Sequence, residues 1–252
     1  MLLIFGHLRL IIPIHAVHGG IYFSCACYSQ DVSLSVLIVD YDAGNLRSVT
    51  RAVARSGARP VVTDKPDDLM SADAVILPGV GSAADTMDKL IARSLDQPLR
   101  EYILSGRPFL GICMGLQALF DFSAEGGGQK CLGILPGTVH HFDLENFKVP
   151  HMGWNTVEWL QDHPVTEGIP KGAYFYFVHS FFAEPQDKQV ILGQTSYGVT
   201  FPSVIAADNV FATQFHPEKS ADLGLALYSN FVSWASGPGY FPGARKGGET
   251  DI

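Results

Sequence analysis

Residues 109–117, with the sequence FLGICMGLQ, constrain the fold more than any other part of the chain. Their apolar start, opened by Pro108, is typical of a buried strand, and the apolar spacing that follows is typical of a helix. Cys113 lies where the two patterns meet, with Gly111 and Gly115 on either side. Side chains at these flanking positions would crowd the backbone of a tight turn. The segment therefore predicts a strained strand-to-helix turn with a thiol at its apex.

This turn has the pattern G-x-C-x-G, the thiol counterpart of the G-x-S-x-G nucleophile elbow. The N-terminus of the following helix would face the Cys113 sulfur, where its partial positive charge favours thiolate over thiol. The N–H group of Met114 would be free to hold an oxyanion. The alternative is that Cys113 is a small core residue, as free cysteines often are. The elbow favours the nucleophile.

A second motif, QFHPEKS at residues 214–220, supplies candidate partners for the thiol. In an extended segment, His216 and Glu218 project to the same side, with Pro217 between them. Pro217 disfavours helix and biases the preceding residue towards the extended region. A structural histidine remains the alternative. Together with Cys113, however, the motif indicates a Cys-His-Glu triad.

The composition restricts the class of protein and its partners. With 252 residues, 47% of them hydrophobic, the chain can form one domain with a large core. A net charge of −8 argues against nucleic acid or an anionic membrane as a partner. The cysteines other than Cys113, which are Cys25, Cys27 and Cys131, do not suggest a disulfide framework. We therefore expect a cytoplasmic enzyme, because a nucleophilic thiol must stay reduced.

The chain divides into three parts. Residues 1–34 are apolar but interrupted by His7 and Arg9, too short to span a bilayer, and only weakly similar to a signal peptide. We expect a poorly ordered or loosely docked extension that adds nothing to the chemistry. Residues 35–235 form the predicted domain. Residues 236–252, rich in glycine and proline, indicate a flexible tail.

The extension also contains residue types that bind zinc, namely His15, His18, Cys25 and Cys27. Their spacing matches none of the common structural zinc patterns. We therefore expect no metal site.

Apolar runs alternate with helical patterns through the first half of the domain, which predicts an α/β fold with a doubly wound, mostly parallel sheet. Strands are expected at 35–40, 60–63 and 74–77 and before Cys113, and helices at about 46–56, 82–93 and 97–105. Later β-rich patches predict an antiparallel extension, at 138–142, 156–159, 174–178, 190–195 and 203–207. A strand at 211–215 is expected to deliver His216, and a helix at about 221–234 to close the domain.

The segment PGVG at residues 78–81 follows one of these strands, at the sheet edge where functional loops gather. The glycines around Val80 allow the backbone to turn an N–H group towards a ligand, as in an oxyanion hole. An ordinary glycine-rich turn is the alternative. A phosphate-binding loop is excluded because G-K-[ST] is absent.

The motifs GICMGLQ and QFHPEKS together resemble those of the class I, triad-type glutamine amidotransferases. Four further segments narrow the resemblance to the glutaminase subunits of imidazole glycerol phosphate synthase, from histidine biosynthesis: DYDAGNL at 40–46, PGVG at 78–81, PHMGWN at 150–155 and YFVHS at 176–180. The resemblance extends from about residue 35 to about residue 234, in the family's order and spacing.

The resemblance implies that glutamine is hydrolysed to glutamate and ammonia through a thioester on Cys113. His216 would protonate the departing ammonia and then activate water, while Glu218 orients the imidazole. No metal or cofactor is implied. The oxyanion and substrate contacts carried over from the family are Gly79, Val80, Gly81, Met114, Gln117, His179, Ser180 and Phe181.

The resemblance also implies a heterodimer with a cyclase subunit that uses the ammonia to form imidazole glycerol phosphate and an aminoimidazole carboxamide ribonucleotide. The residues expected to face or signal to this partner are Asn45, His151, Met152, Trp154 and Lys219. For Trp154 the sequence leaves the protein core as an equal alternative.

The chain departs from the family's pattern at a few positions. Phe181 replaces a usual tyrosine, Asp42 replaces a usual glycine, and Met114 and Leu116 exchange the order of two apolar residues. None of these changes touches the triad. They bear on affinity and interface geometry rather than on the reaction.

Three alternative functions remain open at this point. A glutaminase serving another acceptor, such as pyridoxal phosphate synthase, is disfavoured by YFVHS and PHMGWN. A hydrolase acting alone on γ-glutamyl compounds would need no partner. A catalytically inactive binding subunit is disfavoured because all three triad residues are present.

Overall fold

The computed structural model separates the chain into two compact units, Met1–Ser33 and Leu34–Ile252. It describes residues 3–5, 8–10, 14–17, 20–23, 34–42 and 44–237. In the first unit, β1 (Leu3–Phe5) pairs with β2 (Leu8–Leu10), and β3 (Ile14–Val17) with β4 (Gly20–Phe23), both antiparallel. The predictions that residues 1–34 form a poorly ordered or loosely docked extension without a chemical role, and that residues 236–252 form a flexible tail, remain predictions. The side chains weighed above as zinc ligands lie outside the described part.

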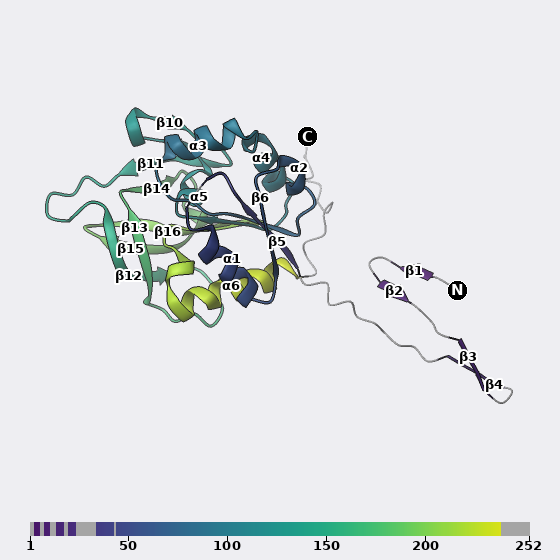
Figure 1. Ribbon diagram of the computed structural model, residues 1–252. Coiled ribbons are helices and arrows are strands. Elements are labelled where there is room, and N and C mark those ends of the chain that lie inside the picture. The colour runs from purple at the N-terminus through teal and green to yellow at the C-terminus, as the bar shows by residue number, and fades with distance from the viewer. Residues whose placement is uncertain are drawn as a thin grey trace, which may run out of the picture. The chain divides into compact units, whose positions relative to one another are not determined.

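A nine-stranded sheet forms the centre of the second unit, in the order β13-β12-β15-β16-β17-β8-β7-β5-β6 (Figure 1). Its parallel half contains β5 (Ser35–Val39), β6 (Arg59–Thr63), β7 (Ala74–Leu77), β8 (Phe109–Ile112) and β17 (Val210–Thr213). All the residues of β7, β8 and β17 are buried, as expected for parallel strands covered on both faces. The predicted α/β fold is confirmed.

The other half of the sheet is antiparallel and contains β12 (His151–Trp159), β13 (Ala173–His179), β15 (Ile191–Tyr197) and β16 (Val199–Ala207). β12 begins at His151 rather than at the predicted residue 156. Pairing with β13 continues through Gly153, which lies opposite Phe177, and glycine provides no strand signal in the sequence.

A second sheet has the order β10-β9-β11-β14 and was not predicted as a separate element. Its strands are β9 (Phe120–Ser123), β10 (Gln129–Lys130), β11 (Leu135–His141) and β14 (Phe181–Pro185). The helix predicted after Cys113 is correspondingly short, α5 (Met114–Gln117). Phe120 pairs with Leu135, and this tertiary contact overrides the helical spacing of residues 116–120.

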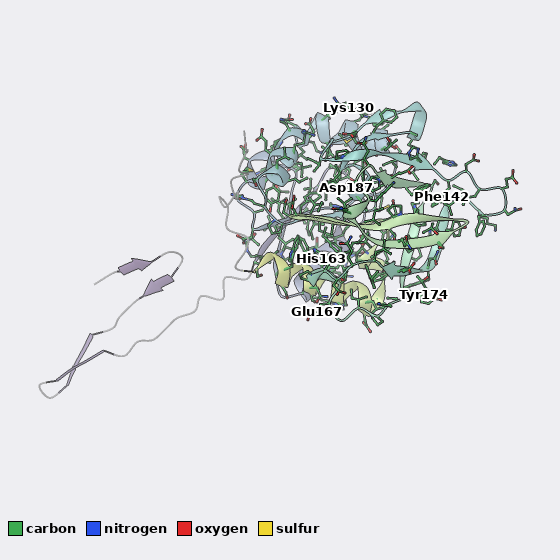
Figure 2. The ribbon with its side chains drawn as sticks, turned by 180° about the vertical axis from the view of Figure 1, so that it is seen from behind. Lys130, Phe142, His163, Glu167, Tyr174 and Asp187 are labelled. Carbon is green, nitrogen blue, oxygen red and sulfur yellow. The ribbon has the colours of Figure 1, made fainter. Side chains whose placement is uncertain are left out.

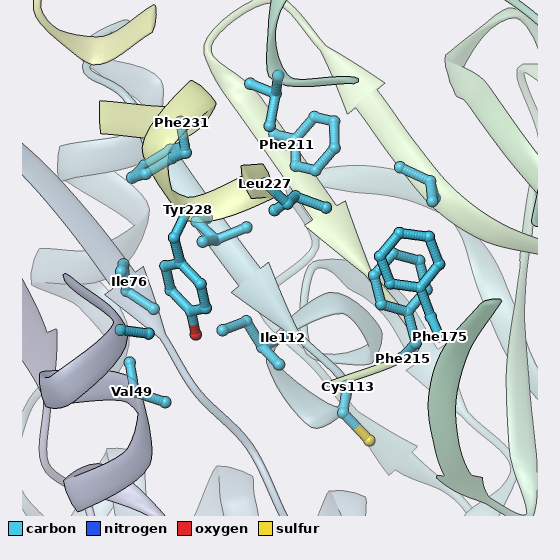
Figure 3. Packing of buried hydrophobic residues seen from close by; sticks show 14 of the residues in the cluster. Val49, Ile76, Ile112, Cys113, Phe175, Phe211, Phe215, Leu227, Tyr228 and Phe231 are labelled. Atoms are coloured by element: carbon cyan, nitrogen blue, oxygen red, sulfur yellow. The ribbon is translucent and has the colours of Figure 1, made fainter. Parts of the chain in front are cut away.

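Helices cover both faces of the nine-stranded sheet and divide the core into two clusters. α1 (Leu46–Arg55) and α6 (Ala221–Ala235) pack on one face, where Tyr228 and Phe231 meet Ile76 and Ile112 (Figure 3). α2 (Pro66–Leu69), α3 (Ala83–Ala92) and α4 (Asp96–Leu104) contribute to the cluster on the opposite face. The described residues of this unit also form four short 3₁₀ helices: η1 (Glu125–Gly127), η2 (Pro164–Thr166), η3 (Lys188–Val190) and η4 (Pro217–Lys219). Within the described residues, no helix has the length and apolar character needed to cross a membrane.

Candidate active site

Cys113 forms the predicted turn between β8 and α5. Its backbone has φ 54° and ψ −103°. Residues other than glycine rarely adopt this conformation, which costs them about 1–3 kcal/mol. The Cys113 N–H group donates to the carbonyl oxygen of Thr213 at 2.7 Å, which ties the turn to the end of β17. The residue is 4% exposed and lies beyond Ile112 at the end of the apolar cluster (Figure 3).

Glycines make this turn possible by allowing close backbone approaches. A Cβ atom at Gly115 would lie 1.9 Å from the Leu77 carbonyl oxygen, and one at Gly111 would lie 2.7 Å from the Gly115 oxygen. A Cβ atom at Gly79 would lie 2.3 Å from the Cβ of Met114. The PGVG loop therefore packs directly against the turn that carries Cys113, as an oxyanion loop requires.

His216 follows β17 with an extended backbone, φ −102° and ψ 97°. Its Nδ1 lies 2.8 Å from Oε1 of Glu218, and both side chains are 1% exposed. The predicted pair is therefore formed, but the predicted extended geometry is wrong beyond His216. Pro217 starts η4, because its fixed φ angle suits the first position of a helical turn. The turn of η4, rather than strand alternation, brings the carboxylate back to the imidazole.

Asn45 supports the carboxylate from the opposite side of the pair. It precedes α1 in a left-handed conformation, with φ 80°, and its Nδ2 donates to Oε1 of Glu218 at 2.5 Å. The sequence placed Asn45 among the residues that face or signal to a partner. In the structure its side chain contacts the candidate triad, so any signal through it would act on Glu218.

The surroundings of His216 favour the imidazolium form. Burial alone lowers the pKa of His216, but the Cys113 sulfur and the Glu218 carboxylate outweigh it and raise that pKa to about 10. Because Nδ1 is engaged by Glu218, Nε2 is the nitrogen left for the sulfur. Nε2 is buried and makes no hydrogen bond of standard geometry to the described protein atoms. The Cys113 sulfur is nevertheless the largest of the influences that raise the pKa of His216, and it favours the imidazolium form that a thiolate–imidazolium pair requires.

A pocket of about 400 Å³ opens above Cys113 and His216. Among the predicted substrate contacts, Gly79 is absent from its walls because it is packed under Met114. The other predicted contacts all line the pocket: Val80, Gly81, Met114, Gln117, His179, Ser180 and Phe181. A cavity of this size fits a small polar molecule such as an amino acid.

Comparison with known proteins places this arrangement in a family. Residues 37–233 match the family model described as "Glutamine amidotransferase class-I". The chain belongs to this family. It is 48% identical over 202 residues to "Imidazole glycerol phosphate synthase subunit HisH" of Dehalococcoides mccartyi (strain ATCC BAA-2266 / KCTC 15142 / 195), which covers 80% of this chain and 98% of the relative. The protein of the same name from Desulfitobacterium hafniense (strain DSM 10664 / DCB-2) is 47% identical over 199 residues, covering 79% and 94%.

Solved structures agree at the level of the fold. The structure titled "Structure of PurLQS from Thermotoga maritima" superimposes with a TM-score of 0.63 at 20% identity, covering 80% of this chain and 99% of that one. A second, titled "Crystal structure of glutamine amidotransferase", gives a TM-score of 0.63 at 21% identity, covering 79% and 98%. The chain is thus a class I glutamine amidotransferase by sequence, and these structures share its fold.

Two polar residues near the amidotransferase triad were missed in the sequence. Glu125 was given no role in the sequence analysis, but it lines the pocket, and its Oε2 accepts from the Ala83 N–H group at 2.6 Å. Gln214 belongs to a recognised motif without an assigned role, and its Nε2 lies 3.6 Å from the Cys113 sulfur. The available signals for a site role were an acidic residue directly before three glycines, which is Glu125, and an amide two residues before His216, which is Gln214.

The residues predicted to face a partner fall into different environments. His151 is buried, and its Nδ1 lies 3.0 Å from Nε2 of His179. Burial lowers the pKa of both histidines, to about 4 for His151 and about 3 for His179, so the pair is neutral near pH 7. Met152 and Trp154 are 62% and 52% exposed. This exposure excludes the core alternative for Trp154.

Proposed function

We propose that this chain is the glutaminase subunit of an imidazole glycerol phosphate synthase, which hydrolyses glutamine and passes the ammonia to a cyclase subunit. The observation that carries the proposal is the cluster of Cys113 and His216 in the wall of the pocket, with Glu218 bound to His216 behind it. It occurs in a chain that aligns with 98% of a curated HisH subunit at 48% identity. The cluster supports the reaction, and the relatives support the acceptor.

In the first half-reaction, the Cys113 thiolate attacks the side-chain amide carbon of glutamine, and a carbon–sulfur bond forms. Backbone N–H groups near Val80 and Met114 hold the developing oxyanion, and loss of one such donor typically costs about 10²–10³ in rate. His216 then donates its Nε2 proton to the departing nitrogen. The carbon–nitrogen bond breaks, which leaves a thioester and free ammonia.

In the second half-reaction, His216 is neutral and accepts a proton from water as the water attacks the thioester. The carbon–sulfur bond breaks, glutamate leaves, and the thiolate–imidazolium pair is restored. Glu218 keeps Nδ1 protonated throughout, so that Nε2 is always the nitrogen that exchanges the proton. Asn45 contributes by holding the acceptor oxygen of Glu218 at 2.5 Å.

The pocket also suits the amino-acid end of glutamine. Oε1 of Gln117 is buried, lies in a residue that lines the pocket, and makes no hydrogen bond to the described protein atoms. Glu125 adds a carboxylate to the same cavity. Both side chains accept hydrogen bonds, and the α-ammonium group of glutamine is a positively charged hydrogen-bond donor that could satisfy both. Ser180, on the wall formed by residues 178–181, is our candidate donor for the α-carboxylate.

An exposed apolar face beside the pocket is our candidate surface for the cyclase. Trp154 on β12 lies opposite Tyr176 on β13, with ring centroids 6.2 Å apart, and Met152 and Tyr174 extend the same face (Figure 2 labels Tyr174). Exposed aromatic and methionine side chains gathered on one face are typical of protein interfaces. Lys219 lines the pocket and places its Nζ 5.7 Å from the Tyr176 ring centroid, so this face adjoins the pocket.

Substitution of the nucleophile tests the proposal. Cys113→Ala cannot form a thioester, so glutamine-dependent product formation should fall to background in the complex with a cyclase subunit. Ammonium salt at a pH that supplies free NH₃ should restore product formation, because the cyclase reaction needs only ammonia. Cys131→Ala is the matched control, since Cys131 is also buried but lies outside the pocket. Continued glutamine turnover by a folded Cys113→Ala complex would refute the nucleophile.

A further inference from the structure

We propose that Gln214 is a positioning residue that holds the Cys113 sulfur as a thiolate, at the end of a directed chain of side-chain amides that starts at the Phe181 carbonyl group. The inference rests on the proposed glutaminase function and deepens it. It adds a neutral hydrogen-bond donor to the environment of the sulfur, separate from the imidazolium of His216.

Three hydrogen bonds form the chain. Nε2 of Gln117 donates to the Phe181 carbonyl oxygen at 2.8 Å and to Oε1 of Gln214 at 3.0 Å. Nε2 of Gln214 lies 3.6 Å from the Cys113 sulfur, within the range of an N–H···S hydrogen bond. Gln117 is 2% exposed, Gln214 is 0% exposed and Cys113 is 4% exposed. Buried amides must satisfy their donors within the protein, so these contacts persist in the folded state.

The direction of the chain follows from the chemistry of its first member. A carbonyl oxygen only accepts, and the Phe181 oxygen accepts from Nδ1 of His179 at 2.8 Å as well as from Gln117. Gln117 must therefore turn its NH₂ group, not its oxygen, towards Phe181. The second N–H of that group meets the Gln214 oxygen. Rotating the Gln214 amide by 180° would place two NH₂ groups against each other, so its own NH₂ group has to face the sulfur.

The strand order holds Gln214 beside the nucleophile. β17 runs parallel to β8, with Thr213 opposite Ile112, so the next residues, Gln214 and Cys113, are neighbours. The Gln214 backbone N–H group donates to the backbone carbonyl oxygen of Ser203 at 2.9 Å, which anchors the main chain at this point. Gln214 is the first residue after β17, and this backbone hydrogen bond and the adjoining strand hold its amide near the sulfur, which suits a fixed position for the reacting atom.

A donor aimed at the sulfur stabilises the charged form more than the neutral one, because the hydrogen bond to an anion is stronger. Gln117 also lines the pocket, and its Oε1 accepts no hydrogen bond from the described protein atoms. The same two amides therefore connect the substrate cavity to the nucleophile. A residue that only filled space at position 214 would not affect the pH at which the thiolate forms.

The test compares Gln214→Met and Gln214→Glu with the unchanged chain, each in complex with a cyclase subunit. The rate at which iodoacetamide alkylates Cys113 is measured as a function of pH, with peptide mapping to separate Cys113 from the other cysteines, Cys25, Cys27 and Cys131. Methionine keeps the length but removes the donor, so the half-maximal rate should shift upwards by about one pH unit. Glutamate keeps the shape and the acceptor for Gln117 but turns an oxygen to the sulfur, and its shift should be at least as large.

Asn209→Ala is the matched control, because Asn209 is a buried amide just before β17, at its other end. Its Nδ2 donates to the carbonyl oxygens of Ile103 and Arg107 at 2.9 and 2.6 Å. This variant should melt at a lower temperature without a change in the alkylation profile. If the pH dependence of Cys113 alkylation is unchanged in folded Gln214→Met, the positioning role is wrong, although the glutaminase proposal stands. If Gln214→Met does not fold, the same result in Gln214→Glu decides the question. Failure of the glutaminase proposal is distinct: it appears as glutamine turnover that survives in Cys113→Ala.

Discussion

Cys113 and His216 are buried side chains, and each would avoid charge if it were buried alone. Beside the Cys113 sulfur, and with Glu218 2.8 Å from its Nδ1, His216 instead favours its charged form. The histidine pair formed by His151 and His179 shows the opposite case, since burial without a carboxylate lowers the pKa of both. Residue type therefore does not decide charge in this protein; the neighbouring groups decide it.

This difference predicts a pH dependence for the stability contributed by His216. Its pKa is raised from 6.5 to about 10 in the folded state, so the protonated form favours folding. The contribution should be complete below pH 6.5 and should disappear as the pH rises through about 10. His216→Gln should therefore reduce the free energy of unfolding more at pH 6 than at pH 10, as measured by urea denaturation. An equal loss at both pH values would contradict the charged state.

The departures from the family's pattern are accommodated locally. The structure uses the backbone carbonyl of Phe181, so the missing tyrosine hydroxyl leaves the amide chain intact. The Phe181 ring packs edge-on against His141, with centroids 4.9 Å apart. Asp42, at φ 63°, forms an ion pair with Arg93, and its N–H group donates to Oδ1 of Asp40 at 3.0 Å. These contacts stabilise a conformation in which glycine is usual.

Among the elements, α6 and η4 hold the triad through one close contact. A Cβ atom at Gly224 would lie 1.8 Å from the Pro217 carbonyl oxygen, so α6 can approach the residue between His216 and Glu218 only because position 224 is glycine. The Ser220 hydroxyl, at the start of α6, donates to the His216 carbonyl oxygen at 2.7 Å. The last helix of the domain thus determines where the imidazole and the carboxylate lie.

Gly224→Ala should displace η4 and reduce both stability and glutaminase activity. Overpacking of this kind typically costs about 1–3 kcal/mol. Gly57→Ala is the control, because a Cβ atom there meets nothing within 4 Å and the only penalty comes from φ +83°. It should cost about 1–2 kcal/mol and leave activity intact. Thermal unfolding and glutamine hydrolysis measure the two effects, and full activity in Gly224→Ala would contradict this account of the close contact.

The β12–β13 hairpin presents the proposed cyclase surface, and Trp154 is its largest exposed side chain. Trp154→Ala should weaken binding to the cyclase subunit while the melting temperature of the free chain changes little, because the side chain contributes little to the core. Trp159→Ala is the comparison on the same strand, since Trp159 packs against the first core cluster and should lower the melting temperature. Loss of the folded free chain in Trp154→Ala would argue against the interface.

At the scale of the whole molecule, the described core and the candidate site belong to the unit Leu34–Ile252. The first strand of its sheet begins at Ser35 and pairs with β6 and β7. Deletion of residues 1–33 should therefore change the melting temperature by less than about 5 °C, which corresponds to roughly 2 kcal/mol for a domain of this size. It should also preserve glutamine turnover. A larger fall in a calorimetric scan would show that the first unit contributes to stability.

The elements that the sequence predicted well are those governed by local chemistry. The continuous apolar strands beside Cys113, the helices α3 and α4, and the glycine-flanked elbow all follow from periodicity and from the steric demands of a tight turn. The elements it missed depend on partners distant in sequence. β9 forms where helical spacing continues, because Phe120 pairs with Leu135, and β12 starts early because β13 lies beside it.

The sequence by itself determined which groups could react, since the thiol, the imidazole and the carboxylate each lie in a recognisable local motif. The tertiary structure alone decided how they meet. η4 turned Glu218 back towards His216, Asn45 was brought to Glu218 across 173 residues, and Gln214 was brought to Cys113 across 101. The physical reason is that motifs encode local backbone preferences, whereas hydrogen bonds between distant segments exist only after the sheet has placed those segments side by side.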